Sequence, residues 1–298
     1  MQSITDFENR FGHHTGLTFK QSDGLIQLFV QNTAATATIA LQGAQLIQWQ
    51  PDNHAEVIWL SNASKPATGK SLRGGIPVCW PWFGAHKNHS GFPAHGFARY
   101  QQWQLESINS NSASSTELTF SLPSENQPEE YWPHRTTVQL IFKIGRTLNL
   151  QLITQNINNE TCEITQALHT YFRVGDIREV TLHGLEDQTY LDKLEDFAQF
   201  TQKNDLTFAS ETDRIYVPSA TNCTIDDPVL NRKIIIEKTG SNSTVVWNPW
   251  QETAEKMGDL GHNGYKSMLC VESANAASDA IKLKPHESHT LEVNYRIE

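Results

Sequence analysis

Short hydrophobic runs that alternate with polar residues recur along most of the chain. Side chains of a β-strand point to opposite faces in turn, so a period of two predicts strands with one buried face. The runs recur roughly every ten residues between clusters of Asn, Ser, Gly and Pro, a spacing typical of β-sandwiches and β-barrels. The predicted strands read GLIQLFVQN, TATIALQG, TELTFSL, TTVQLIFKIG, TLNLQLITQNIN, KIIIEK, STVVWN and HTLEVNYRIE. The sequence therefore predicts an all-β fold.

Three segments depart from this pattern. Residues 190–200, YLDKLEDFAQF, are the best candidate for a short helix. Residues 107–117 are small and polar and predict a surface hairpin loop, whereas residues 122–135 contain three prolines and predict a longer excursion. Strands of the same character continue on both sides of these segments and no fixed-period repeat is present. We therefore expect residues 1–298 to form one sandwich domain.

Charge and composition narrow the classes of partner. The formal net charge is −10, so a nucleic acid or an anionic membrane surface would be repelled, and a small molecule is the expected ligand. No apolar stretch approaches the length of a membrane span, and the N-terminal residues lack the features of a leader, so we expect a cytoplasmic protein. The four cysteines form no CxxC pair and are expected to be reduced, buried thiols; they are Cys79, Cys162, Cys223 and Cys270.

The first candidate site is SLRGGIPVCWPWFG, residues 71–84. Gly74 and Gly75 permit a backbone with positive φ or a close approach of another group, and Arg73 lies directly beside them. A guanidinium next to exposed amides suits a phosphate or a carboxylate. A tight turn whose arginine pairs with a surface acid accounts for this stretch equally well.

The second candidate is GFPAHGFARY, in which His95 and Arg99 recur among aromatic residues. Aromatic faces together with arginine suit a sugar ring with a charged substituent, although a single histidine is more often structural. His86, His89 and His95 also raise the question of a metal site. Their spacing matches no standard motif and no helix aligns them, so we expect no metal there.

The third and fourth candidates each carry one ionisable group in an apolar setting. Alternation along ALHTYF places His169 on the same face as Ala167 and Tyr171, a rigid mounting that suits general acid or base catalysis. Glu272 ends the apolar strand SMLCVESAN, on the face that Cys270 occupies, and a carboxylate there must be paired, hydrogen-bonded or raised in pKa. A core histidine is an equally simple account of His169, and a structural salt bridge is the alternative for Glu272.

Six motifs in this order resemble the hexose-6-phosphate mutarotase branch of the aldose 1-epimerase family. They read LRGGIPVCWPWFG, PAHGFAR, ALHTYFRVGD, ETDRIY, VVWNPW and CVESAN, and the resemblance extends from about Gly24 to the last strand. It implies a large antiparallel β-sandwich of the galactose-mutarotase type, with the sugar site in a concave groove. The strand pattern agrees with that fold independently.

The resemblance also implies an activity, the interconversion of the α and β anomers of glucose 6-phosphate and related hexose 6-phosphates. Glu272 would be the general base that takes the proton of the anomeric hydroxyl, and His169 the general acid that protonates the ring oxygen. The hemiacetal then opens, rotates about its C1–C2 bond and closes on the other face. This chemistry needs no cofactor and no metal, and we expect the protein to act as a monomer.

The same resemblance assigns the substrate contacts. His95 would lie near the ring oxygen, Asp213 would bind sugar hydroxyls, and Arg73 and Arg99 would hold the 6-phosphate through charge-assisted hydrogen bonds. Three aromatic residues are candidates either for the walls of the groove or for the core; they are Trp82, Phe83 and Trp247.

Two other functions remain open from the sequence. A glycoside hydrolase uses two carboxylates on either side of one bond, and Asp213 could in principle serve beside Glu272. A sugar-phosphate binding or sensing protein could keep the fold without turnover. The presence of both His169 and Glu272 favours the enzyme, because a binding protein needs no matched acid and base.

Overall fold

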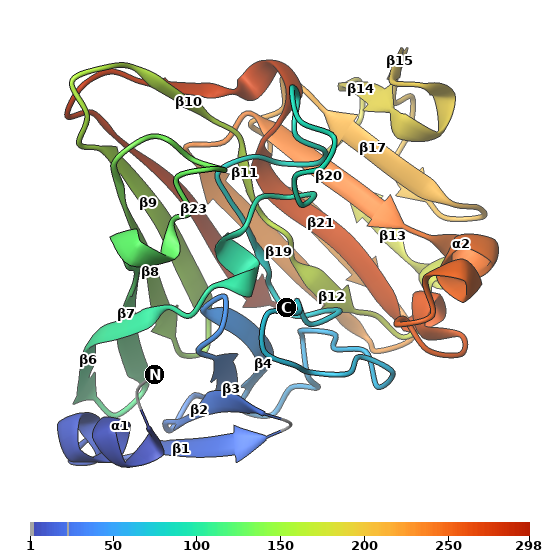
Figure 1. Cartoon of the computed structure of the whole chain (residues 1–298). Helices are drawn as coiled ribbons and strands as arrows, with labels where there is room; N and C mark the ends of the chain where they lie inside the picture. Colours follow the sequence, from blue (N-terminus) through green and yellow to red (C-terminus); the bar gives the residue numbers. More distant parts are fainter. Residues whose placement is uncertain (1–2, 23) are drawn as a thin grey trace.

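Two large antiparallel sheets dominate the computed structural model, which describes residues 3–22 and 24–298 (Figure 1). In spatial order the nine-stranded sheet consists of β16 (Leu206–Thr207), β13 (Thr181–His183), β18 (Cys223–Asp227), β19 (Arg232–Thr239), β23 (Ser288–Ile297), β9 (Leu148–Asn156), β8 (Thr136–Ile144), β7 (Ser115–Leu122) and β6 (Gln104–Ser112). The eight-stranded sheet consists of β15 (Ala198–Thr201), β14 (Thr189–Asp192), β17 (Thr212–Tyr216), β20 (Ser243–Asn248), β21 (Met268–Asn275), β11 (Gln166–Leu168) and β5 (Val78–Cys79), with β12 (Tyr171–Arg173) also paired to β21.

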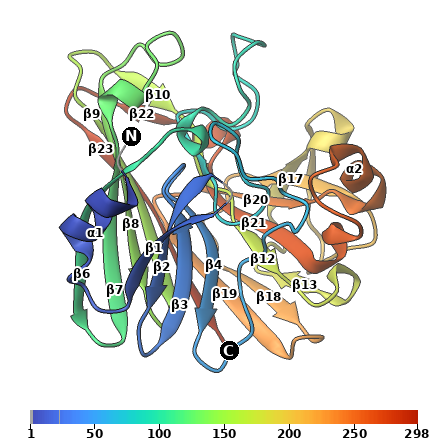
Figure 2. The same cartoon turned by 60° about the horizontal axis from the view of Figure 1, so that its bottom comes forward.

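Smaller elements flank these sheets. The strands of a four-stranded sheet are β1 (Leu17–Ser22), β2 (Leu25–Gln31), β3 (Ala35–Ala40) and β4 (Gln45–Pro51), and a two-stranded sheet pairs β10 (Cys162–Ile164) with β22 (Ile281–Leu283). The two α-helices are α1 (Ile4–Phe11) and α2 (Trp250–Met257), and the short 3₁₀ helices are η1 (Ala98–Tyr100), η2 (Ser124–Asn126), η3 (Ile177–Glu179), η4 (Lys193–Glu195), η5 (Gly264–Ser267) and η6 (Ala277–Asp279). Figure 2 shows α1 beside β6, where Arg10 Nη2 donates a hydrogen bond of 2.9 Å to the Glu106 carbonyl.

The two large sheets pack against each other through their apolar faces. Phe172 on β12 meets Tyr295 on β23 edge to face, with 5.1 Å between ring centroids. The Tyr295 hydroxyl also lies 2.7 Å from Thr170 Oγ1, and Trp80 Nε1 donates to Thr154 Oγ1 on β9 at 3.0 Å. One cluster of buried hydrophobic residues runs from α1 through both sheets to β23. These contacts fix the eight-stranded sheet, which carries the predicted chemistry, on a continuous core.

The predicted strands are confirmed. All eight alternating runs coincide with strands, and β8 and β9 show the expected regular alternation of buried and more exposed positions. Residues 107–117, predicted to be a hairpin loop, are mostly strand: β6 continues to Ser112, β7 begins at Ser115, and only residues 113 and 114 form the turn of the hairpin. Residues 122–135 contain the predicted excursion between β7 and β8. The sequence-based assignment of an all-β antiparallel sandwich is therefore correct.

The helix predicted over residues 190–200 is wrong. The segment forms β14, the short η4 turn and β15, because Tyr190 pairs with Tyr216 on the neighbouring strand β17. Asp196 and Phe197 then adopt left-handed backbone conformations, which an α-helix does not tolerate. Phe197 is about half exposed, so no apolar helix face would be buried.

The two α-helices lie outside the sequence prediction, although α1 carries a recognisable start signal. Ser3 caps the helix by accepting a hydrogen bond from the Asp6 backbone, and the Asp6 side chain accepts a bond from the Ser3 backbone in return, the arrangement called a capping box. Within the described residues both α-helices are eight residues long, and none is long and apolar enough to cross a membrane. The four cysteines are free and buried, as predicted.

Two glycines hold the loop that carries Arg73 against the core. Gly74 has φ +111° and pairs with Leu60, while Gly75 has φ +71° and donates from its backbone N–H to the Trp59 carbonyl at 2.7 Å. A Cβ on Gly74 would lie 2.5 Å from the Trp59 oxygen, and one on Gly75 would lie 2.5 Å from the Leu46 oxygen. Both predicted uses of glycine, positive φ and close approach, therefore occur in this loop.

Replacing Gly74 with alanine should destabilise the protein. The added methyl meets backbone atoms that have no room to move, so we expect Gly74→Ala to lower the free energy of unfolding by about 3 kcal/mol in urea denaturation. Gly69→Ala is the matched control, because Gly69 also has positive φ but its added methyl would meet none of the described atoms within 4 Å; it should lose only about 1 kcal/mol. Equal losses in the two variants would contradict this account of the loop.

Candidate active site

Strand β21 supplies the centre of the site. Glu272 and Cys270 lie two residues apart and therefore point to the same face of the sheet. The strand is buried at all eight positions, so Glu272 occupies its interior and not its end, a correction to the sequence prediction. Register across neighbouring strands places Trp247 and Tyr171 opposite Cys270, and Asp213 opposite Trp247. Residues from four strands thus share one face around Glu272.

His169 lies beside Glu272, at a break between two strands. The prediction placed it on a continuous strand, but β11 ends at Leu168 and β12 begins at Tyr171. Its backbone N–H donates to the Pro77 carbonyl at 3.0 Å, and its ring stacks on Tyr171 with 4.8 Å between centroids and 7° between planes. The break turns the imidazole toward Glu272, so that Nδ1 and Oε1 are 3.4 Å apart. The mounting is rigid, although it is not a strand.

The side chains of His169 and Glu272, which we call the couple, are deeply buried. His169 is 7 % exposed and Glu272 is 1 % exposed, yet His169 Nδ1 and Glu272 Oε2 have no hydrogen-bond partner among the described residues. Burial raises the pKa of Glu272 well above its usual value, and the nearby Asp213 carboxylate adds to that effect. Burial lowers the pKa of His169 well below its usual value, with further lowering by His95 and Arg99. Both groups are therefore held toward their neutral forms.

His95 lies beside His169, in a loop whose next residue, Gly96, pairs with Trp80. The two imidazole centroids are 5.6 Å apart, and the His95 backbone N–H donates to the Gly84 carbonyl at 2.7 Å. The Gly84 N–H points at His95 Nδ1 at 3.4 Å, so Nδ1 accepts and Nε2 carries the ring proton. Burial and the charge of Arg99 lower the pKa of His95 to about 3, which leaves a neutral ring whose Nε2–H is a donor.

Arg73 reaches the site with part of its guanidinium already engaged. Its Nε lies 3.1 Å from each carboxylate oxygen of Asp259, and its Nη1 donates to the Tyr171 hydroxyl at 3.1 Å. The pairing with an acid, one of the two alternatives that the sequence left open, therefore occurs, and Tyr171 is a second partner of Arg73. Nη2 is the nitrogen of Arg73 for which the described residues provide no bond, so an anion would be bound there.

Arg99 lies four residues after His95, in η1. Its Nη2 donates to the Ala94 carbonyl at 2.9 Å and to the Tyr100 hydroxyl at 2.7 Å, and its guanidinium lies over the Tyr100 ring. Its buried Nε has no partner among the described residues. The positive charges of Arg99 and Arg73 both act on His95 and on His169. Two cations therefore flank the histidine side of the site in a protein of net charge −10.

Asp213 lies on the opposite flank and has a cationic partner that the sequence analysis missed. Lys193 Nζ donates to Asp213 Oδ2 at 2.6 Å, and the lysine side chain is 55 % exposed. Burial raises the pKa of Asp213, whereas Lys193 opposes that shift. The charge of Lys193 also acts on Glu272 and on His95. This ion pair therefore borders the site near Glu272.

The three aromatic candidates divide between the core and the site. Trp82 is buried in the main core, with its Nε1 bonded to the Pro93 carbonyl at 2.9 Å. Phe83 meets His95 edge to face at 4.9 Å. Trp247 stands nearly perpendicular to the His169 ring at 6.1 Å. Phe83 and Trp247 therefore line the site, and Trp82 belongs to the core.

Tyr171, Asp259 and Lys193 are the site residues to which sequence reasoning gave no role. Tyr171 was seen only as a neighbour of His169, because its bond to Arg73 joins residues 98 positions apart. Asp259 lies 186 positions from Arg73 and carries no motif of its own. Lys193 lies in the segment 190–200, for which the sequence predicts a helix and not the turn that brings the lysine to Asp213. Only a tertiary structure reveals these three partnerships.

Two sets of side chains contain residue types that bind metals. His86 and His89 pack against Phe92, whereas His95 points to His169, so these three imidazoles do not face a common point. Among the residues that the structure describes, donor atoms of His169, Cys270 and Glu272 lie within 4.8 Å of one another.

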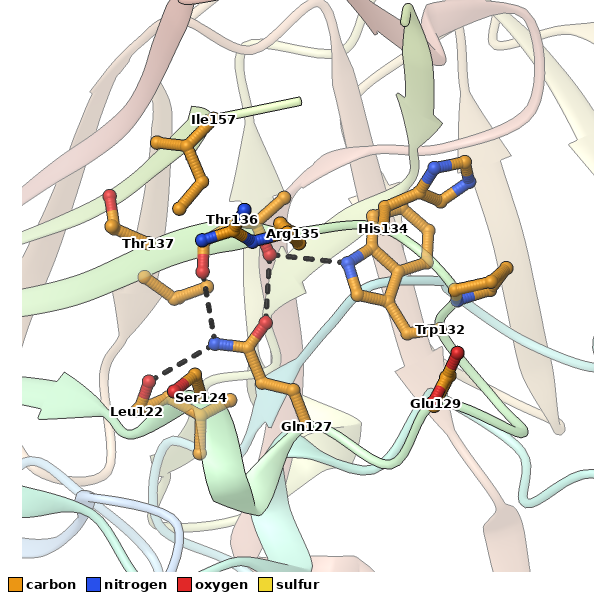
Figure 3. Close-up of a pocket in the computed structure, with 12 residues that line it drawn as sticks. Leu122, Ser124, Gln127, Glu129, Trp132, His134, Arg135, Thr136, Thr137 and Ile157 are labelled. Carbon is orange, nitrogen blue, oxygen red and sulfur yellow. Dashed lines mark hydrogen bonds between the residues drawn. The ribbon is translucent and has the colours of Figure 1, made fainter. Parts of the chain in front are cut away.

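A separate cavity of about 620 Å³ lies between the end of β7 and the start of β8 (Figure 3). Gln127 Nε2 donates to the carbonyls of Leu122 and Thr136 at 3.1 and 3.2 Å, and Trp132 Nε1 donates to Thr136 Oγ1 at 3.1 Å. Thr136 Oγ1 in turn donates to Gln127 Oε1 at 2.8 Å. Its lining includes none of the six predicted site residues, all of which the structure describes. The side chains of Gln127, Trp132 and Thr136 therefore satisfy one another in this wall, whose lining also includes Glu129, His134 and Arg135.

Comparison with known proteins agrees with this geometry. The pattern that defines the aldose 1-epimerase family matches residues 27–296. A relative from Escherichia coli named "Putative glucose-6-phosphate 1-epimerase" is 38 % identical over 274 residues, which cover 92 % of this chain and 91 % of the relative. The crystal structure titled as a "putative mutarotase" from Salmonella typhimurium has a TM-score of 0.89 and 36 % identity, over 96 % of this chain and 94 % of that one.

A more distant structure extends the likeness of fold. A galactose mutarotase-like protein from Clostridium acetobutylicum has a TM-score of 0.71 at 17 % identity, and the match covers 95 % of this chain and 98 % of that one. At this identity the likeness concerns the fold alone, which is the predicted galactose-mutarotase-like sandwich. The family pattern and the relative from E. coli both span most of the chain, and this protein belongs to the aldose 1-epimerase family.

Proposed function

We propose that this protein is an epimerase that interconverts the α and β anomers of hexose 6-phosphates, with glucose 6-phosphate as the reference substrate. The observation that carries the proposal is the buried His169–Glu272 couple, 3.4 Å apart and flanked by Arg73 and Arg99. An acid and a base serve proton transfer, and two arginines serve an anionic substituent. The names of the relatives from E. coli and S. typhimurium support the same reaction.

Ring opening uses the couple in its ion-pair form. Between them the two side chains hold one transferable proton, which burial favours on Glu272 and which passes to His169 across 3.4 Å. The Glu272 carboxylate then takes the proton of the O1 hydroxyl while the protonated His169 gives its proton to the ring oxygen. The C1–O5 bond breaks and C1 becomes an aldehyde. The couple is left as a neutral carboxylic acid and a neutral imidazole, the forms that burial stabilises.

Ring closure runs the same transfers in reverse. After rotation about C1–C2, the C5 hydroxyl attacks the other face of the aldehyde. His169 removes the proton of that hydroxyl while Glu272 returns a proton to the carbonyl oxygen, which becomes O1 of the other anomer. The couple regains its starting proton arrangement, so the reaction needs no outside acid or base. Burial raises the pKa of the Glu272 carboxyl and lowers that of the His169 imidazolium, which stabilises the uncharged pair that ring opening forms and ring closure consumes.

Arg73 and Arg99 bind the 6-phosphate in this proposal. The ring oxygen is two bonds from C6, so a phosphate near the histidine side of the site is compatible with His169 acting on that oxygen. Arg73 offers Nη2, and Arg99 offers its buried Nε, which has no partner among the described residues. Asp259 and Tyr171 hold the Arg73 guanidinium in place, which makes them positioning residues. Fixed guanidinium groups lose less side-chain entropy when they bind a phosphate.

Three further side chains bind the sugar itself. His95 donates from Nε2–H to the region of the ring oxygen, and its neutral ring does not compete for the proton that His169 transfers. Asp213 accepts from sugar hydroxyls on the Glu272 side. Lys193, which is bonded to Asp213, keeps that carboxylate ionised and adds a donor at the exposed edge of the site.

We propose in addition that the chain acts as a monomeric, single-domain protein of the cytoplasm. The core cluster that joins both large sheets supports a single domain for residues 1–298. All of the proposed proton-transfer and phosphate-binding groups come from one chain, so the reaction requires no second copy and no cofactor. Its substrates are soluble sugar phosphates, which is consistent with a cytoplasmic location and with the absence of a nucleic-acid or membrane partner.

Removal of either member of the couple should abolish most of the activity. We expect His169→Ala and Glu272→Gln each to slow anomer exchange of glucose 6-phosphate by about 10²–10⁴-fold, the usual contribution of a positioned acid or base. Magnetisation transfer between the two anomeric protons in NMR measures the exchange at equilibrium, with the spontaneous rate subtracted. A wild-type protein that leaves the exchange at the spontaneous rate would overturn the proposed function.

Loss of an arginine should affect phosphorylated substrates selectively. We expect Arg73→Ala and Arg99→Ala to lower kcat/KM for glucose 6-phosphate by about 10–100-fold, because each removes a charge-assisted hydrogen bond. The small activity on free glucose should change little. Arg146→Ala, at the exposed turn between β8 and β9, is the matched control and should behave as wild type. If both sugars lose activity to the same degree, the two arginines do not bind the phosphate.

The pH dependence of the reaction should report the shared proton. The couple is active with one proton, so activity falls at alkaline pH when Glu272 loses it and at acid pH when His169 gains a second one. The raised pKa of Glu272 moves the alkaline fall upward and the lowered pKa of His169 moves the acid fall downward. Profiles of kcat/KM against pH measure the acid fall and the alkaline fall. Free glucose is used as the substrate, because a phosphate group itself titrates near pH 6 and would add its own pH dependence. An alkaline fall that begins at the ordinary carboxyl pKa of about 4.3 would contradict this assignment.

A further inference from the structure

Cys270 completes a set of three metal-binding donors at the catalytic couple. Its sulfur, a ring nitrogen of His169 and a carboxylate oxygen of Glu272 lie within 4.8 Å of one another. Cys270 and Glu272 share one face of β21, and the pairing of Cys270 with Tyr171 brings the β11–β12 break, with His169, beside them. Three side chains from adjacent parts of one sheet therefore converge on a small volume.

Two of these donors have lone pairs that nothing in the described structure uses. His169 Nδ1 and Glu272 Oε2 are buried without a hydrogen-bond partner, and both residues are more than nine-tenths buried. Unsatisfied buried polar atoms are rare and point to a missing ligand or a catalytic role. A cation bound between His169 and the Glu272 carboxylate would use the Nδ1 lone pair, for which no hydrogen bond is present among the described residues.

The chemistry of the three donors fits zinc, and so does the separation of two of them. Nδ1 of His169 and Oε1 of Glu272 are 3.4 Å apart. Two ligands at about 2.0–2.1 Å from a tetrahedral Zn²⁺ ion are themselves separated by about 3.4 Å. A thiolate, an imidazole and a carboxylate together favour zinc over magnesium or calcium, which prefer oxygen ligands. Three protein ligands leave the fourth position of the ion to water.

We propose that His169, Cys270 and Glu272 form an inhibitory Zn²⁺ site, and that a bound ion blocks anomer exchange by occupying the lone pairs that the reaction uses. Blocking rests on the proposed function, whereas binding does not. Metal uptake converts the Cys270 thiol to a thiolate and leaves Glu272 as a carboxylate, so a resting protein with both protonated releases two protons to solvent. Binding therefore tightens as the pH rises.

The charges around the site limit its affinity for Zn²⁺. Arg73, Arg99 and Lys193 oppose a cation, while the thiolate and carboxylate of the site neutralise it and Asp213 adds a further negative charge. The ion and a sugar phosphate compete for the same catalytic groups. We therefore expect zinc inhibition that substrate relieves and that a chelator reverses.

Binding is tested with Zn²⁺ and with Co²⁺ as a spectroscopic substitute. Isothermal titration of the wild-type protein with Zn²⁺ should give one site, and Co²⁺ should produce the near-ultraviolet charge-transfer band of a cobalt–thiolate bond. Cys270→Ala should remove the band and weaken Zn²⁺ binding at least about tenfold, as expected for loss of a direct ligand. Cys223→Ala, a buried cysteine on β18 in the other sheet, is the matched control and should keep both signals.

Inhibition is tested separately, with each variant compared with its own metal-free rate. Zn²⁺ should slow anomer exchange of wild type and of Cys223→Ala, and should affect Cys270→Ala at concentrations at least about tenfold higher. If the wild-type protein with Co²⁺ shows no thiolate band, the proposed site is wrong, and this result does not depend on whether a variant folds. A band that survives Cys270→Ala overturns the site as well. One-site Zn²⁺ binding to a protein without anomer exchange would leave the site standing and remove the proposed function.

Discussion

The burial of a carboxyl and an imidazole beside each other, without other hydrogen-bond partners in the described structure, is the constraint on which this site depends. A buried unpaired charge is costly, so the protein holds His169 and Glu272 toward their neutral forms. The surrounding strands fix both groups in this setting: β21 is buried at every position, and His169 is tied by its backbone to Pro77 and by its ring to Tyr171. Arg73, Arg99 and Lys193 then set the field around the couple, which favours an anionic ligand.

Most of the fold could be predicted because strand alternation is a local property. Buried and more exposed positions alternate along β8 and β9, although Ile141 and Ile153 place apolar side chains on the more exposed face, and a sheet that buries one face requires that alternation. The helix predicted over residues 190–200 is wrong for a tertiary reason. The order of polar and apolar residues there suits a helix, but the pairing of Tyr190 with Tyr216 on β17 makes the segment a strand. The helix α1 could have been found, since Ser3 and Asp6 form a capping box that the sequence displays.

The candidate site was predicted in part. Residue patterns singled out His169, Glu272, His95, Arg73 and Arg99, and the motif resemblance added Asp213 and the role of each residue. The structure brings His169, Glu272 and His95 together, and the charges of the two arginines act on both histidines. The partners of these residues could not be predicted, because Asp259 and Tyr171 meet Arg73 across 186 and 98 residues and Lys193 meets Asp213 through a turn that was taken for a helix. Local patterns identify reactive side chains, whereas long-range pairing decides what holds them.

The central claim is that His169 and Glu272 act as one unit in anomer exchange. A double-mutant cycle on the exchange rate of glucose 6-phosphate tests this most directly, with His169→Ala, Glu272→Gln and the double variant measured by NMR magnetisation transfer. Residues that share one proton-transfer step are strongly non-additive, so the double variant should be no slower than the slower single variant. Losses that multiply, so that the double variant falls by the product of the two single effects, would contradict a coupled acid and base.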